Sequence, residues 1–235
     1  MSRRVRVWDL PTRFVHWALV LCVIAAFITE TIGGAAMPWH GRIGLLILGL
    51  VMFRLVWGIV GSTHARFVNF VRGPAAIREY LAGQWRGLGH NPLGALSVLA
   101  LLALLLAQVG TGLFANDDIA FDGPLASLVE RATSNALTHW HHRIKTLLLV
   151  VVALHVGAIV YYARVKRDNL VKPMLSGWKD IGDARDDIKA DDARGGGMLA
   201  FLLALLVAVA TVVAASGIWV PAPPPAPAEQ AAPAW

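Results

Sequence analysis

The chain has 235 residues, of which 57% are hydrophobic and 15% are charged, and its mean hydropathy is +0.59. Soluble domains carry about 25% charged residues, so this composition excludes a soluble enzyme and a disordered chain and indicates an integral membrane protein. The net charge of +6 is also typical of nucleic-acid-binding proteins, but we assign it to membrane topology and expect no nucleic-acid partner.

Five apolar stretches are long enough to cross a membrane, since a spanning helix needs roughly 20 mostly apolar residues. They are Phe14–Ile32, Ile43–Val60, Leu93–Phe114, Thr146–Ala163 and Met198–Val220. The stretches are rich in Leu and Ala without strand-like alternation, which favours helices. The first follows several arginines, as a signal peptide does, but it is longer than a signal peptide's apolar core, so we expect a retained helix. The sequence thus predicts an all-α membrane protein.

Basic residues gather in three segments that fall on one side of the membrane if all five stretches span it. These segments are the N-terminus, residues 61–91 and residues 164–197. Because basic loops face the cytoplasm, the sequence predicts a cytoplasmic N-terminus and an extracytoplasmic C-terminus in the bacterial cell membrane. In this prediction, membrane lipid surrounds the helices.

The first four stretches carry the candidate functional residues, whereas the fifth has neither a histidine nor a charge. We therefore divide the chain into a four-helix bundle at 1–180, a cytoplasmic linker at 181–197, an appended fifth helix at 198–220 and an extended Pro/Ala-rich tail at 221–235. Three glycines end the linker, which predicts little rigid coupling between the fifth helix and the bundle.

Histidines in apolar surroundings are the main functional signal, because an ionisable side chain in hydrocarbon is costly and marks a functional site by default. His16 lies in the first stretch, His40 at the entrance to the second and His155 deep in the fourth. The entrance to the fourth stretch holds His139, His141 and His142. We expect His139 and His142 to be solvated, together with the loop histidines His64 and His90.

The fourth helix presents His141 and His155 on one face. At 3.6 residues per turn, the interval between them is about 40° short of whole turns and rises about 21 Å. His142 lies about 140° around the helix from His155. One histidine therefore lies near each membrane surface, and we predict that His40 pairs with His141 on the outer side and His16 with His155 on the inner side.

Two imidazoles on facing helices are typical axial ligands of haem iron, since a neutral ring nitrogen binds the metal without burying a charge. Two such pairs predict two haems, and filling both axial positions favours electron transfer over oxygen binding. The alternative is four unrelated structural histidines. We assign Arg54, a basic residue inside the second stretch, to a haem propionate near the inner surface; snorkelling to the interface is its alternative.

Several sequence motifs support a family resemblance. They are VWDLPTRFVHW at 7–17, HGRIG at 40–44, FRLVWG at 53–58, GSTHARF at 61–67, and the interval from His141 to His155 followed by DNLV at 168–171. Together they resemble the prokaryotic cytochrome b-561 family, which includes the cytochrome b subunits of membrane-bound nickel–iron hydrogenases. The resemblance covers roughly residues 5–180 and leaves out the fifth helix.

This resemblance implies a four-helix transmembrane bundle holding two haem b groups, with ligands at the positions of His16, His40, His141 and His155. One departure is His142, where family members often have an acidic residue. Because the spacing argument and the family spacing agree, we take His141 rather than His142 as the ligand.

We expect a di-haem cytochrome that transfers electrons between the quinone pool and a protein redox partner in a respiratory chain. The chain lacks a nucleotide-binding glycine fingerprint and a cysteine cluster for iron–sulfur ligation, so it is an electron-transfer protein or an oxidoreductase subunit rather than a stand-alone enzyme. The partner is either a nickel–iron hydrogenase or similar oxidoreductase that the chain anchors, or a c-type cytochrome. A transporter with a histidine relay is the alternative from another class.

Overall fold

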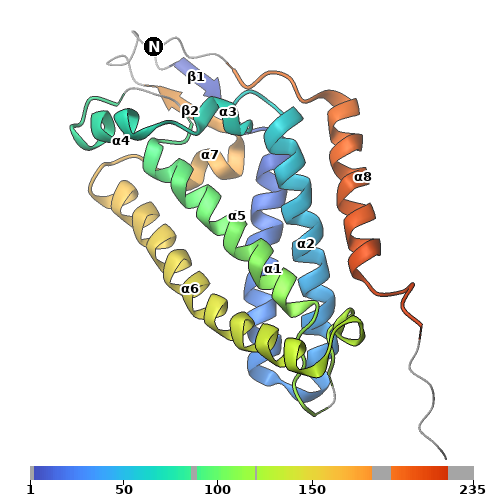
Figure 1. Cartoon of the computed structure of the whole chain (residues 1–235). Helices are drawn as coiled ribbons and strands as arrows, with labels where there is room; N and C mark the ends of the chain where they lie inside the picture. The colour runs from blue at the N-terminus through green and yellow to red at the C-terminus, as the bar shows by residue number, and fades with distance from the viewer. Residues whose placement is uncertain (1–2, 86–88, 120, 182–191, 222–235) are drawn as a thin grey trace, which may run out of the picture.

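The computed structural model describes residues 3–85, 89–119, 121–181 and 192–221. Five long helices dominate it (Figure 1). They are α1 (Leu10–Ile32), α2 (Met37–Val60), α5 (Pro92–Gly112), α6 (Arg131–Arg164) and α8 (Gly197–Ala215). Each is long and apolar enough to cross a membrane. The predicted all-α membrane fold is therefore confirmed.

Each of these helices begins earlier than the apolar stretch that predicts it, most clearly α1, α2 and α6. Asp9 caps α1 by accepting a hydrogen bond from the Thr12 amide at 2.7 Å, and Pro11 lies in the first turn, where proline is favoured. The helix α6 begins at Arg131, so His141 lies inside it rather than at its entrance. Hydropathy locates the apolar part of a helix, whereas its polar extension is invisible to that signal.

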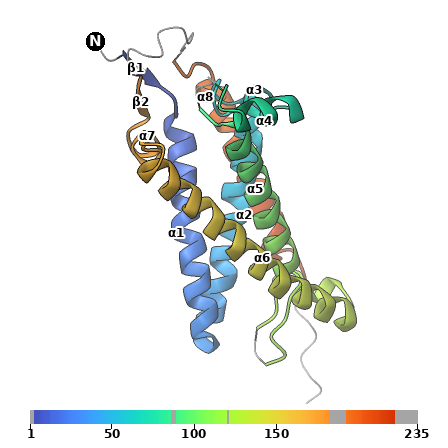
Figure 2. The same ribbon diagram turned by 90° about the vertical axis from the view of Figure 1, so that its left-hand side faces the viewer.

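The helix α2 is the centre of the bundle. It packs against α8, α1 and α5, and α6 packs in turn against α5. Figures 1 and 2 show α8 beside α2 on the side away from α6. The core joins Ile47, Leu48 and Val51 of α2 to apolar side chains of α5 and α6. In the described part of the chain, α1 and α6 are not among the closely packed pairs.

Shorter elements cover the end of the bundle where α1 begins, which we call the His16 end; the opposite end is the His40 end. The covering helices are α3 (Phe67–Phe70), α4 (Pro74–Leu81) and α7 (Val171–Ser176). The strand β1 (Arg3–Arg6) pairs antiparallel with β2 (Trp178–Ile181). Two short 3-10 turns, Gly34–Ala36 and Ala126–Leu128, lie between the long helices. The sequence analysis did not predict the strand pair, which ties the N-terminus to the segment after α6.

The helix α8 is packed more firmly than its glycine-rich approach predicts. Ala204 is fully buried and Ala208 nearly so, in a cluster with Phe53 and Trp57 of α2. Gly196 adopts φ +86°, and a Cβ there would lie 2.8 Å from the Trp57 ring. The expected loose attachment is therefore not what the described residues show. Most of the linker, at 182–191, and the tail at 222–235 lie outside the described residues.

Asp9 joins the first two helices at the His16 end. Besides capping α1, its carboxylate accepts hydrogen bonds from Trp57 Nε1 at 3.0 Å and from the Ser62 hydroxyl. We expect Asp9→Ala to lower the free energy of unfolding by about 2–4 kcal/mol, because it removes a helix cap and leaves two buried donors unpaired. Thermal unfolding in detergent measures this, with the exposed Asp122→Ala as the control; equal melting temperatures would refute the assignment.

Candidate functional site

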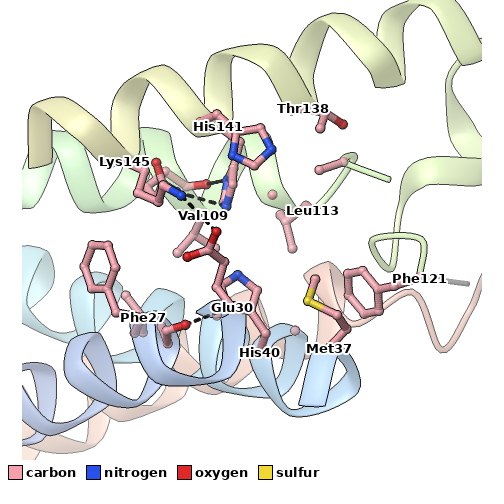
Figure 3. A pocket seen from close by; sticks show the side chains of 18 of the residues that line it. Phe27, Glu30, Met37, His40, Val109, Leu113, Phe121, Thr138, His141 and Lys145 are labelled. Carbon is pink, nitrogen blue, oxygen red and sulfur yellow. Dashed lines mark hydrogen bonds and ion pairs between the residues drawn. The ribbon is translucent and has the colours of Figure 1, made fainter. Parts of the chain in front are cut away.

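A cavity opens at the His40 end between α1, α2, α5, α6 and the loop that follows α5 (Figure 3). Its empty volume is about 1140 Å³ with its mouth included. Most of its wall is apolar, from residues such as Val23, Leu105 and Leu148. Ligand pockets in proteins are typically lined by apolar side chains with a few polar groups, and the wall of this cavity has that character.

His40 and His141 lie on opposite walls of this cavity, on α2 and α6 (Figure 3). Their ring centres are 6.2 Å apart and the ring planes are inclined by 81°. A metal–imidazole bond is about 2 Å long, so two rings that bind one metal ion from opposite sides have centres roughly 6 Å apart. The separation of the two rings therefore suits a shared metal.

Both rings are held through Nδ1 by a backbone carbonyl of a neighbouring helix. His40 Nδ1 lies 3.0 Å from the Ala26 carbonyl oxygen of α1, and His141 Nδ1 lies 2.8 Å from the Gln108 carbonyl oxygen of α5. Donation from Nδ1–H to a carbonyl fixes the tautomer that leaves Nε2 as the metal-binding atom, and metal-bound histidines usually have such a partner. His141 Nε2 is 2.9 Å from the Gln108 amide nitrogen, which the metal would replace.

Glycines make room on the walls of the same cavity. Gly44 on α2 has no heavy atom within 4 Å of the position where a Cβ would lie. A Cβ at Gly112 would lie 2.8 Å from the His141 ring. A flat macrocycle can approach the helix backbone where no side chain intervenes. The cavity, the paired rings and the open glycine together fit a haem at this end.

His16 and His155 occupy the other end of the bundle. They lie close enough to interact electrostatically, although they come from α1 and α6. His155 Nδ1 is 3.2 Å from the Ser97 hydroxyl of α5, an arrangement like that of His40 and His141. His16 Nδ1 is buried and has no partner in the described part of the chain. The structure thus brings the rings of His40 and His141 together, and it places His16 and His155 within electrostatic range of each other.

Arg54 lies at the His16 end of α2 and is only 7% exposed. Its guanidinium carbon is 5.1 Å from the centre of the Phe67 ring, and Nη1 is buried without a hydrogen-bond partner. A buried guanidinium does not match snorkelling to the interface. An unpaired donor of this kind fits an anionic group such as a propionate.

The remaining histidines follow the expectation only in part. His139 and His142 are exposed, and His142 also borders the cavity. His90 differs from the predicted solvated loop residue, because its ring packs between Trp8 and Phe70 and its Nδ1 is buried. The two partner rings come from distant parts of the sequence, so the sequence held no local signal of this burial.

The sequence analysis also missed an ion pair at the edge of the cavity. Lys145 Nζ of α6 lies 2.9 Å from Glu30 Oε1 near the end of α1 (Figure 3). Both side chains are partly buried. This pair joins α1 to α6 beside His40 and His141. A charged residue near the end of the first apolar stretch was the available signal for it.

A bundle of apolar helices with two histidines facing each other across a cavity defines the class of membrane proteins that hold a metal cofactor between their helices. The family model for prokaryotic cytochrome b561 matches residues 7–177. The chain therefore belongs to this family of membrane b-type cytochromes, which carry haem and transport electrons.

Curated relatives agree with this assignment. A protein of Azotobacter vinelandii named probable Ni/Fe-hydrogenase B-type cytochrome subunit is 25% identical over 78% of this chain and 91% of the relative. A protein of Bradyrhizobium diazoefficiens with the same name is 21% identical over 76% of this chain and 87% of the relative. A probable Ni/Fe-hydrogenase 1 B-type cytochrome subunit of Escherichia coli K12 is 20% identical over 74% and 89%. No solved structure matches this chain.

Proposed function

We propose that this cytochrome holds two haem b groups, one between His40 and His141 and one between His16 and His155. The observation that carries the proposal is the pair of rings 6.2 Å apart across an apolar cavity. Their Nδ1 atoms lie against carbonyl oxygens of neighbouring helices, which leaves both Nε2 atoms to coordinate iron. Ser97 supports the same role for His155.

Haem iron supplies the one-electron chemistry when it is bound, and the chain's own residues set the conditions for it. Two histidines would hold each haem iron, an arrangement that would favour electron transfer over oxygen binding. The helix α6 carries one ligand of each pair and thereby fixes the separation of the two sites at about 21 Å along its axis. The apolar walls keep water away from the site.

We further propose that electrons pass between the quinone pool and a protein partner in a respiratory chain. The names of the relatives favour a nickel–iron hydrogenase as this partner. The basic segments at the His16 end favour a cytoplasmic N-terminus in the bacterial cell membrane, with α8 ending on the opposite side. Co-purification with a hydrogenase, and reduction of the haem by hydrogen in that complex, support the partner; reduction by a c-type cytochrome alone contradicts it.

Haem stoichiometry tests the two-site proposal directly. We expect the purified full-length protein to contain two non-covalent haem b groups per chain, because each histidine pair would coordinate one haem iron. A pyridine haemochrome assay, combined with a protein determination by amino-acid analysis, measures the ratio. A ratio near one haem per chain would contradict one of the two proposed sites. A ratio near zero would contradict the whole proposal and favour a transporter that uses histidines as a proton relay.

A further inference from the structure

Buried polar atoms without partners gather at the His16 end of the bundle. In the described part of the chain, those at this end are Thr12 Oγ1, Arg13 Nε, His16 Nδ1, Arg54 Nη1, Arg66 Nε and His90 Nδ1, whereas one other such atom, Gln108 Oε1, lies at the His40 end. Leaving a buried polar group unpaired is destabilising, and more so for a charged group. A cluster made mostly of nitrogen donors therefore indicates that an acceptor binds among them.

Arg54 supplies the positive charge of this cluster. Asp9 interacts with it electrostatically, but the Asp9 oxygens already accept hydrogen bonds from the Thr12 amide, Trp57 and Ser62. The Phe67 ring lies against the guanidinium without offering an acceptor for Nη1. The buried cation thus has room for one further anionic partner.

His90 supplies a second donor within electrostatic range of this charge. Its ring centre lies 4.6 Å from that of Trp8 and 4.4 Å from that of Phe70. Burial, together with the nearby charge of Arg54, lowers the pKa of His90 to about 3, so the ring is neutral at physiological pH. His90 also lies within electrostatic range of His16 and His155. A neutral imidazole protonated at Nδ1 can donate one hydrogen bond there.

We propose that Arg54 and His90 together bind one carboxylate of the cofactor held by His16 and His155. A carboxylate accepts several hydrogen bonds through its two oxygens, so one guanidinium N–H and one imidazole N–H can share it. One cation and one neutral donor leave the buried pair electrically balanced against a single negative charge. This inference rests on the proposed function, because a haem supplies the carboxylate through its propionates. A lipid headgroup is the other source of an anion.

Redox potentiometry of the full-length, haem-loaded protein tests the proposal. The background is His141→Ala, which retains only the haem at the His16 end. We expect His90→Leu to lower the midpoint potential of this haem by about 59 mV, a tenfold shift in a one-electron equilibrium, because a less neutralised carboxylate favours ferric iron. The smaller side chain of His90→Asn keeps an N–H donor near the position of Nδ1, and we expect it to keep the potential of the parent.

Further variants separate this role from simple packing. Arg54→Met should lower the same potential, and combining it with His90→Leu should shift the potential by less than the sum of the two changes, because both residues act on one carboxylate. His139→Phe, an exposed residue on α6, is the control and should change nothing. If His90→Leu does not accumulate, Arg54→Lys is compared with Arg54→Met. Arg54→Lys keeps the positive charge and should keep the potential, whereas Arg54→Met removes the charge and should lower the potential.

The outcomes distinguish failure of the shared carboxylate from failure of the proposed haem sites. Unchanged potentials in His90→Leu and Arg54→Met, with haem fully retained, would overturn the shared carboxylate and leave the proposed haem sites intact. Additive shifts would likewise overturn it. Loss of bound phospholipid in these variants without any shift in potential would assign the anion to a lipid headgroup. Absence of haem from the unmodified protein would contradict the proposed function itself.

Discussion

His155→Ala is expected to remove the haem at the His16 end and to leave the other in place, and His141→Ala is expected to do the reverse. In the proposed arrangement, each substitution would remove one of the two histidines that hold one haem. The two positions share one face of α6 but lie about 21 Å apart along it. Neither side chain therefore supports the other site, and haem content should fall from two groups per chain to one in each variant.

Optical spectra of the reduced proteins, together with the haem-to-protein ratio, measure this loss. The matched control is His142→Ala, which neighbours His141 on α6 but is exposed and should retain both haems. His141 is the ring that lies 6.2 Å from His40 and is held by the Gln108 carbonyl. Loss of a haem from His142→Ala, with retention of both in His141→Ala, would show that the ligand at this position is His142.

The long helices could be predicted from the sequence because a bilayer imposes a length and a composition on any spanning segment. Their ends could not be predicted in the same way. The first part of α6 is polar and helical, and Asp9 starts α1 before its apolar stretch begins. The pairing of β1 with β2 depends on segments far apart in the sequence. Such contacts leave no periodic signal.

The histidine pairs could be predicted because depth in a membrane follows from position in a helix. His40 and His141 fall at one depth, and the structure brings their rings together. Burial in a loop follows no such rule. His90 is covered by Trp8 before α1 and by Phe70 of α3, and only the folded chain assembles these three residues. Its burial is therefore evident from the structure alone.

Small residues on α8 explain how it lies so close to α2. A Cβ at Gly49 would approach Val212 to 2.9 Å, and Ala204 and Ala208 are buried against the same helix. Small residues allow helices in a membrane to approach closely and so to associate through dispersion forces. The sequence contains these residues, but an all-apolar helix does not reveal which face its neighbour takes. The packing of α8 was therefore not predictable from its composition.

Removal of α8 is expected to leave both haems bound and to destabilise the bundle. A chain that stops after Ala193 loses the helix packed on Phe53 and Trp57. None of the residues that line the cavity belongs to α8, and α8 lies on the side of α2 away from α6. Lipid then covers the face of α2 that α8 leaves, so the truncated chain loses packing contacts without exposing apolar surface to water. We expect unchanged haem content and a lower melting temperature.

A point substitution separates the packing of α8 from its presence. Ala204→Leu forces a larger side chain into a fully buried position, and overpacking costs about 1–3 kcal/mol, so its melting temperature should fall toward that of the truncated chain. Val209→Leu on the exposed face of α8 is the control and should match the parent. Haem content and potentiometry of all three proteins complete the test. The contacts predict neither loss of a haem nor a large shift in one potential on truncation, because α8 does not line the cavity. Either result would therefore show that α8 belongs to the electron-transfer unit.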